Sequence, residues 1–280
     1  MKLSAADLAR LAPPLRILVF LLVLVLLWLP LALPLYGLAA SEVMPLGGAI
    51  ATGFLYVVFL VLWPIWARRV HRLKRPWRSL GWLLQPEVTA DWLLGLCLGL
   101  GGIVALVGIE LVLGWATPMP APQNLFRIIL EGGLVAVAVG LAEETLFRGW
   151  FLFEMEQGLT SSQALWGTSL VFAVAHFIKP LPDILATLPQ FFGLFLLGMA
   201  LAWARRTPSH ASPVRTALGY PMGLHSGLVW GYYLLNVGQV AKLTQAVPAW
   251  VTGLQGNPLA GLLGLGLLGG LATLFYRSSH

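Results

Sequence analysis

Eight apolar segments, separated by short polar connections, make up most of this sequence. Their approximate bounds are 15–38, 46–67, 90–115, 125–150, 163–178, 184–204, 217–236 and 256–276. About 20 consecutive apolar residues are enough for a helix to cross the hydrocarbon core of a bilayer. The segments therefore predict an all-α, polytopic membrane helix bundle of about eight transmembrane helices, with residues 1–280 forming a single integral membrane domain.

The composition agrees with this prediction and excludes an ordinary soluble protein. Of the 280 residues, 58% are hydrophobic and only 10% are charged, whereas about 25% of the residues of a soluble domain are charged. The single cysteine, Cys97, excludes an intrachain disulfide framework. Because Cys97 lies within an apolar segment, we expect it to be a small, buried apolar side chain.

Two pairs of glycines spaced four residues apart are candidate close-packing positions between helices. They are Gly95 and Gly99 in the third segment and Gly266 and Gly270 near the C-terminus. This pattern predicts helix packing and indicates no function.

Positive charges are distributed unequally between the two ends of the predicted spans. If the N-terminus is cytoplasmic, 14 of the 17 Lys and Arg residues fall in cytoplasmic segments, and the other three are Arg127, Lys179 and Lys242. This bias predicts an N-in, C-in orientation. The net charge of +6 then reflects loops that face anionic lipid headgroups, so we expect the lipid bilayer, and no nucleic acid, as a partner. The compact size and short loops indicate a bacterial plasma (inner) membrane.

The C-terminal half of the fourth apolar segment contains three charged residues, Glu143, Glu144 and Arg148. On insertion scales, a charge at the centre of a membrane helix costs about 2.5–3.5 kcal/mol, so three isolated charges are unfavourable there. Glu144 and Arg148 are spaced i, i+4, which places them on one helix face and predicts an ion pair. Glu143 points in another direction and is left for another partner. Ionisable groups within spans usually have a function, and an ion pair that only locks helix packing is the alternative.

Two histidines within apolar segments are candidate partners for these carboxylates. Gly158 and Ser161 suit a turn near residue 160. An antiparallel hairpin folded at this turn brings His176 to the depth of Glu143, since each lies some fifteen residues from the turn. The second histidine, His225, lies near the start of the seventh segment.

Two glutamates, two histidines and one arginine at compatible depth predict a buried catalytic cluster. A carboxylate there can hold and deprotonate a water molecule, while neutral imidazoles bind a metal or stabilise an oxyanion. We assign Glu143 as the base, because Arg148 neutralises Glu144. The cofactor is left open: if a metal is bound, zinc is a candidate, with Glu143, His176 and His225 as its three ligands.

At these residues the sequence resembles the CAAX prenyl endopeptidase and bacteriocin-processing family of intramembrane proteases, often called Abi proteins. The family's Glu-Glu-x-x-x-Arg motif, its Phe-x-x-x-His motif and a histidine on a later span match Glu143, Glu144, Arg148, Phe172, His176 and His225. The resemblance covers roughly residues 90–236 and implies a family-like catalytic core there. It also implies a multi-helix bundle whose motifs line a cavity within the membrane.

The sequence departs from the family pattern at Val229, where the family usually has Asn or Asp four residues after the last histidine. If that side chain holds the oxyanion, proteolysis is slowed or lost in this chain. The leading hypothesis is an intramembrane endopeptidase that cuts a peptide or membrane-protein substrate near the cytoplasmic side, with a water activated by Glu143. The alternative is a non-catalytic membrane scaffold or immunity protein with the same fold. A proton-coupled transporter is weaker, because no inverted repeat is visible.

Overall fold

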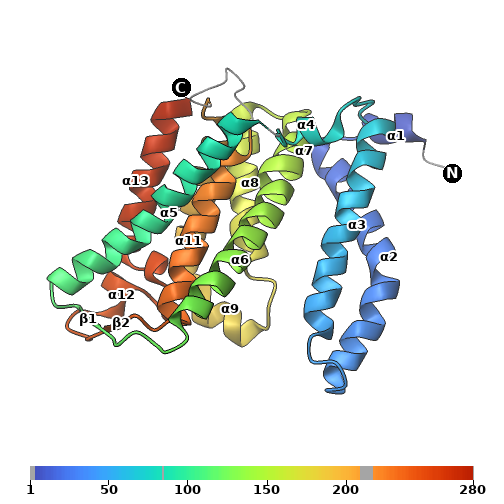
Figure 1. The fold of residues 1–280 in the computed structure, drawn as a ribbon. Coiled ribbons are helices and arrows are strands. Elements are labelled where there is room, and N and C mark those ends of the chain that lie inside the picture. The colour runs from blue at the N-terminus through green and yellow to red at the C-terminus, as the bar shows by residue number, and fades with distance from the viewer. Residues whose placement is uncertain (1–3, 84, 209–216, 280) are drawn as a thin grey trace. The chain divides into compact units, whose positions relative to one another are not determined.

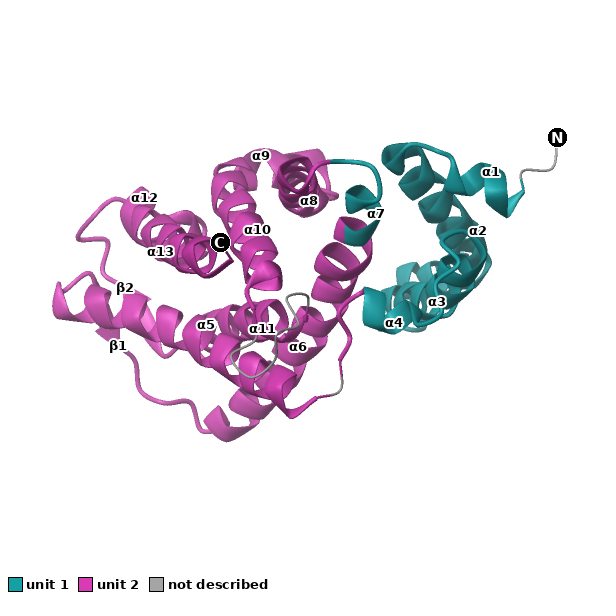
Figure 2. Cartoon of the chain, turned by 90° about the horizontal axis from the view of Figure 1, so that it is seen from above, with its two compact units in different colours: residues 1–79, 153–159 teal, residues 80–152, 160–280 magenta. Residues whose placement is uncertain are grey.

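The computed structural model describes residues 4–83, 85–208 and 217–279 and places most of them in helices (Figure 1). The chain divides into two compact units (Figure 2). The first contains residues 1–79 and 153–159, and the second contains residues 80–152 and 160–280.

The first unit is built around a pair of long helices. Its elements are α1 (Ala5–Ala9), α2 (Pro13–Ala40), α3 (Gly47–Arg69), α4 (Pro76–Ser79) and most of α7 (Leu152–Glu156). Helices α2 and α3 pack against each other, and Phe20 is buried edge-on against Phe59 and Trp66. The unit also contains a buried polar network, in which Glu154 accepts hydrogen bonds from Arg16 and Trp66 and contacts His71. The ion pair between Arg16 and Glu154 compensates the cost of burying Arg16. The charge count alone places Arg16 in a cytoplasmic segment and does not predict this burial.

In its described residues, the second unit is a bundle of five long helices with short connecting elements. The long helices are α5 (Pro86–Val112), α6 (Leu125–Glu144), α10 (Phe191–Arg206), α11 (Gly219–Asn236) and α13 (Leu262–Ser279). The remaining elements are β1 (Ala116–Pro118), η1 (Thr145–Phe151), α8 (Ser161–Ala175), α9 (Leu181–Thr187), η2 (Leu188–Gln190), β2 (Ala241–Leu243), α12 (Ala249–Thr252) and η3 (Pro258–Ala260). Helix α11 lies among α5, α6 and α10 (Figure 2). Its buried face contributes Leu224 and Leu228 to the core.

Glycines allow α11 to approach α5 closely. A Cβ atom on Gly95 of α5 would lie 2.6 Å from the Tyr220 carbonyl oxygen, and one on Gly227 of α11 would lie 2.6 Å from the Leu100 amide nitrogen. These distances leave no room for a side chain, as in small-residue helix contacts of membrane proteins. The close-packing role predicted for Gly95 and Gly99 is therefore confirmed.

Two other expectations about α5 and α13 are wrong. The same close-packing role was predicted for Gly266 and Gly270, but nothing lies within 4 Å of a Cβ on either residue, because that face of α13 is open. Cys97 was expected to be buried, yet it is exposed, since it lies on the face of α5 that turns away from Gly95 and Gly99.

Among the described residues, five helices are long and apolar enough to cross a membrane, which indicates an integral, multi-pass membrane protein. They are Pro13–Ala40, Gly47–Arg69, Pro86–Val112, Leu125–Glu156 and Leu181–Arg206. The other three predicted segments are also helical, as α8, α11 and α13, but α8 has only 15 residues, and α11 and α13, with 18 residues each, are less apolar than the five candidate spans. The sequence did not predict the small antiparallel sheet in which Ala116 of β1 pairs with Leu243 of β2.

Candidate active site

The charged motif of the fourth predicted span lies where an α-helix changes into a π-helix. Helix α6 ends at Glu144 and continues directly into a π-helix, Thr145–Phe151. Thr145 donates a hydrogen bond from Oγ1 to the Leu141 carbonyl at 2.6 Å and accepts one from Trp82 Nε1 at 3.2 Å. A hydroxyl that bonds a helix carbonyl competes with the backbone ladder at that point. Short π-helical segments within helices are frequent at functional sites.

Arg148 and Glu144 form the ion pair that their i, i+4 spacing predicts. Arg148 Nη1 lies 2.9 Å from Glu144 Oε1, and both side chains are fully buried. Arg148 Nη2 also donates to the Gly198 carbonyl at 3.1 Å, and the guanidinium carbon lies 4.3 Å from the centre of the Phe172 ring. A buried guanidinium needs such partners, because an unpaired buried charge is strongly unfavourable. The pair therefore holds Glu144 in one orientation.

Glu144, at the end of α6, in turn orients His225, which lies on the neighbouring helix α11. His225 Nδ1 lies 2.7 Å from Glu144 Oε1. A carboxylate can only accept a hydrogen bond, so Nδ1 carries a proton, and in the neutral ring Nε2 carries the lone pair. His225 Nε2 lies 4.0 Å from Glu143 Oε2. The two nitrogens of this imidazole thus face the two adjacent glutamates.

Glu143 differs from Glu144 in its surroundings. Its side chain is 33% exposed, whereas Glu144 is fully buried. Among the described residues, no hydrogen-bond donor reaches Oε2 of Glu143 or Oε2 of Glu144, although both atoms are enclosed. Buried acceptors normally receive a hydrogen bond from protein or water, so these two Oε2 atoms can each accept a hydrogen bond from a bound molecule. Glu143 is the more accessible of the two carboxylates and the one that faces His225 Nε2.

His176 lies beside the same aromatic ring but does not pair with Glu143 within the part of the chain that is described. Its Nδ1 lies 2.8 Å from the carbonyl oxygen of Phe172, one turn earlier in its own helix. The Phe172 ring packs against both histidines, with centroid distances of 4.7 Å to His176 and 6.0 Å to His225. The predicted partnership of Glu143 with His176 is replaced by the contact with His225. The reason is local: α8 ends at Ala175, and His176 caps it.

The candidate zinc ligands do not form a ligand set. Among the residues that the structure describes, no three His, Cys, Asp or Glu side chains are grouped so that they can hold a metal ion. His225 and His176 each use Nδ1 for a hydrogen bond to an oxygen, which leaves Nε2 as the ring nitrogen able to bind a metal, but His176 is not grouped with Glu143 and His225. Catalytic zinc needs three protein donors at about 2.0–2.2 Å from one point. This arrangement therefore does not fit zinc, and the hydrolysis proposed for this site uses no metal ion.

Sequence reasoning missed one buried cation that supports the motif. Arg205 donates from Nε to the Arg148 carbonyl at 3.2 Å and from Nη2 to the Leu80 carbonyl at 3.1 Å. It therefore satisfies backbone acceptors around the π-helix. Its sequence position, at the end of an apolar segment, is typical of a cytoplasmic loop charge and gave no signal of this contact.

Val229, the position at which the sequence departs from the family pattern, follows His225 by one helical turn and is partly buried.

Comparison with known proteins agrees with the motif resemblance. Residues 125–231 match the family model described as type II CAAX prenyl endopeptidase, Rce1-like. Neither the curated proteins nor the solved structures give a significant match. The matched segment contains Glu143, Glu144, Arg148, Phe172, His176 and His225. Over this segment the chain is therefore similar to the type II CAAX prenyl endopeptidases, and the match supports the family that the motifs resemble.

Proposed function

We propose that this chain is an intramembrane endopeptidase that hydrolyses a peptide bond with a water molecule activated by Glu143. One observation carries the proposal. Glu143 Oε2 and His225 Nε2 are 4.0 Å apart, and the other ring nitrogen of His225 is fixed by Glu144. Two acceptors at this separation suit a single water that donates one hydrogen to each. With hydrogen bonds of about 2.8 Å, the angle at the water oxygen is roughly 90°, close to the angle within a water molecule.

In this mechanism, Glu143 acts as the general base. It takes a proton from the water, and the resulting hydroxide oxygen attacks the carbonyl carbon of the scissile peptide bond. The same proton then passes from Glu143 to the leaving amine, so that one water and one peptide bond yield a carboxylic acid and an amine. His225 orients the water, and Arg148 and Glu144 hold His225. His176, when protonated, offers Nε2–H as a donor to the oxyanion while Nδ1–H stays on the Phe172 carbonyl.

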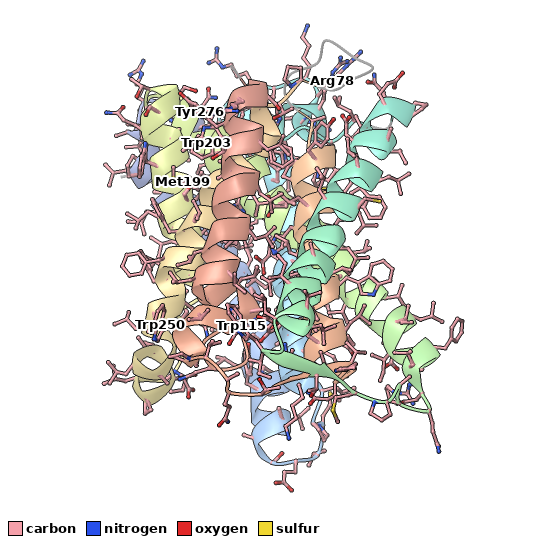
Figure 3. All side chains as sticks on the ribbon, turned by 90° about the vertical axis from the view of Figure 1, so that its left-hand side faces the viewer. Arg78, Trp115, Met199, Trp203, Trp250 and Tyr276 are labelled. Atoms are coloured by element: carbon pink, nitrogen blue, oxygen red, sulfur yellow. The ribbon has the colours of Figure 1, made fainter. Side chains whose placement is uncertain are left out.

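We also propose the membrane arrangement in which this chemistry takes place. It is a single integral domain of about eight transmembrane helices, N-in and C-in, in a bacterial inner membrane. The charge division supports it, as do aromatic residues at both ends of the second unit (Figure 3). Trp203 and Tyr276 pack together with a centroid distance of 5.3 Å near one end, and Trp115 and Trp250 lie near the other. Trp and Tyr favour the two membrane–water interfaces.

A second candidate function is a non-catalytic scaffold or immunity protein of the same fold. Val229 favours it, because an aliphatic side chain one turn after His225 offers no donor to an oxyanion. Val229→Asn separates the two functions. In an enzyme that lacks only this donor, the substitution raises the cleavage rate, whereas in a scaffold it creates no cleavage.

The substrate we propose is a peptide or a membrane protein, with the bilayer as surroundings and no nucleic acid. The direct test compares the membrane proteomes of cells that carry the wild type or Glu143→Ala. Glu131→Ala is the matched control, because Glu131 lies on the same helix and is 45% exposed. An uncut polypeptide that accumulates only with Glu143→Ala supports the endopeptidase. Identical proteomes for all three strains contradict it and favour the scaffold.

A further inference from the structure

A cavity of about 280 Å³ lies at the end of the second unit where α5 and α11 finish and where β1, β2 and α12 are found (Figure 1). Its lining includes Glu110, Asn236, Gln239, Lys242 and Thr252. Asn236 follows His225 by 11 residues on α11, which is about 16 Å along the helix axis. The cavity is therefore separate from the cluster of Glu143, Glu144 and His225, and its function is independent of the proposed proteolysis.

Glu110 is the feature of this cavity that requires an explanation. The residue is 4% exposed, and its Oε1 atom is enclosed without a hydrogen-bond partner among the described residues. No ion pair to Glu110 occurs in the described part of the chain either. A buried carboxyl group without a donor is costly, and buried polar groups normally accept a hydrogen bond from protein, water or a bound group. An occupant of the cavity that donates hydrogen bonds to Glu110 provides the missing partner.

The other polar groups of the lining are mainly acceptors. Asn236 donates its amide nitrogen to the Tyr232 carbonyl at 3.1 Å, and Gln239 donates its own to the Asn236 carbonyl at 2.6 Å. Both amide oxygens are therefore left as acceptors. No aromatic side chain is among the lining residues that the structure describes. Quaternary ammonium ligands are bound in aromatic cages, so this lining suits a primary ammonium instead.

Lys242 provides a charge of the opposite sign. It is exposed on β2 and is the one cationic side chain among the described residues of the lining. A ligand that carries an ammonium group and an anionic group can therefore contact Glu110 with the first and Lys242 with the second. The volume of about 280 Å³ suits a small group rather than a peptide chain.

The depth of the cavity indicates where such a ligand comes from. The candidate span Pro86–Val112 ends two residues after Glu110, and Trp115 and Trp250 lie near the same end of the unit (Figure 3). This is the level at which lipid headgroups meet interfacial tryptophans. We propose that the Glu110 cavity binds a phosphoethanolamine group, with its ammonium on Glu110 and its phosphate at Lys242, and that the group is the headgroup of a membrane phosphatidylethanolamine.

The experiment measures lipid binding to purified, delipidated protein in detergent. Phosphatidylethanolamine and phosphatidylcholine with the same acyl chains are titrated, and bound lipid is counted by native mass spectrometry. Wild type should prefer phosphatidylethanolamine, and Glu110→Gln should lose about tenfold or more of this affinity, because hydrogen bonds to charged groups are the strong ones. Glu131→Gln, an exposed glutamate on α6, should bind as wild type does. Lys242→Ala should weaken binding as well. Because Lys242 is exposed, this substitution should leave the fold intact.

Two results overturn the proposal. The first is equal binding of the two lipids by the wild type, and the second is an unchanged preference in a folded Glu110→Gln or Lys242→Ala protein. Water-soluble O-phosphoethanolamine distinguishes the two sources of the group. If it displaces the lipid only weakly, a membrane lipid is the ligand. If it binds more tightly than the lipid, the lipid source is wrong and the ligand is a free zwitterion.

Discussion

His225 Nδ1 lies 2.7 Å from Glu144 Oε1, so that a histidine of α11 and a glutamate of α6 are joined within the bundle. The same glutamate oxygen lies 2.9 Å from Arg148 Nη1. One carboxylate thus neutralises a fully buried arginine and fixes a histidine ring. The adjacent glutamate, Glu143, is left facing the free nitrogen of that ring at 4.0 Å.

Arg148→Ala should reduce stability as well as activity. The substitution leaves Glu144 buried without its cation, and breaking a buried pair in this way typically costs about 3–5 kcal/mol. Arg127→Ala is the matched control, because Arg127 forms an i, i+4 pair with Glu131 on the same helix, but with 74% of its side chain exposed. The measurement is thermal unfolding in detergent. Equal unfolding temperatures for the two variants would contradict the role given to the buried pair.

Gly227→Leu should disrupt the contact between α11 and α5. A Cβ on Gly227 would already lie 2.6 Å from the Leu100 amide nitrogen, and overpacking of a tight contact typically costs about 1–3 kcal/mol or more. His225 would be displaced with the helix. Gly266→Leu is the control, since nothing lies within 4 Å of a Cβ there. Expression level and unfolding temperature should fall for Gly227→Leu only, and comparable losses in both variants would refute the packing argument.

Cleavage should not depend on a bound metal. Among the described residues, the candidate ligands Glu143, His176 and His225 are not grouped so that all three can reach one metal ion. We expect purified protein to retain its cleavage rate after prolonged treatment with a strong chelator. Stoichiometric zinc that is absent from His225→Ala, together with activity restored only by added zinc, would show that the water mechanism is incomplete.

The sequence predicted the parts of the site that depend on helical spacing. Glu144 and Arg148 are one turn apart, and an ion pair between them follows from that spacing alone. The spacing of Gly95 and Gly99 likewise predicted a close helix contact, but it did not identify Gly223 and Gly227, the glycines of α11 on the other side of this contact.

The relations between distant segments were harder to predict. An ideal hairpin near residue 160 brings Glu143 and His176 to one depth, but a π-helix over Thr145–Phe151 and the end of α8 at Ala175 change that geometry. The contact between Glu144 and His225 joins positions 81 residues apart, and no local pattern encodes it. The burial of Arg205 is a similar case, since the Arg148 and Leu80 carbonyls that it contacts are backbone groups, which carry no sequence signature.

The central claim is that Glu143 is the general base, and Glu143→Gln tests it most directly. Glutamine preserves the shape of the side chain, which is 33% exposed, so the unfolding temperature in detergent should stay near that of the wild type. An amide cannot take a proton from water, so the cleavage rate of the polypeptide identified in the membrane proteome should fall by about 10²–10⁴-fold. A folded Glu143→Gln protein that cleaves this polypeptide at the wild-type rate would contradict the account.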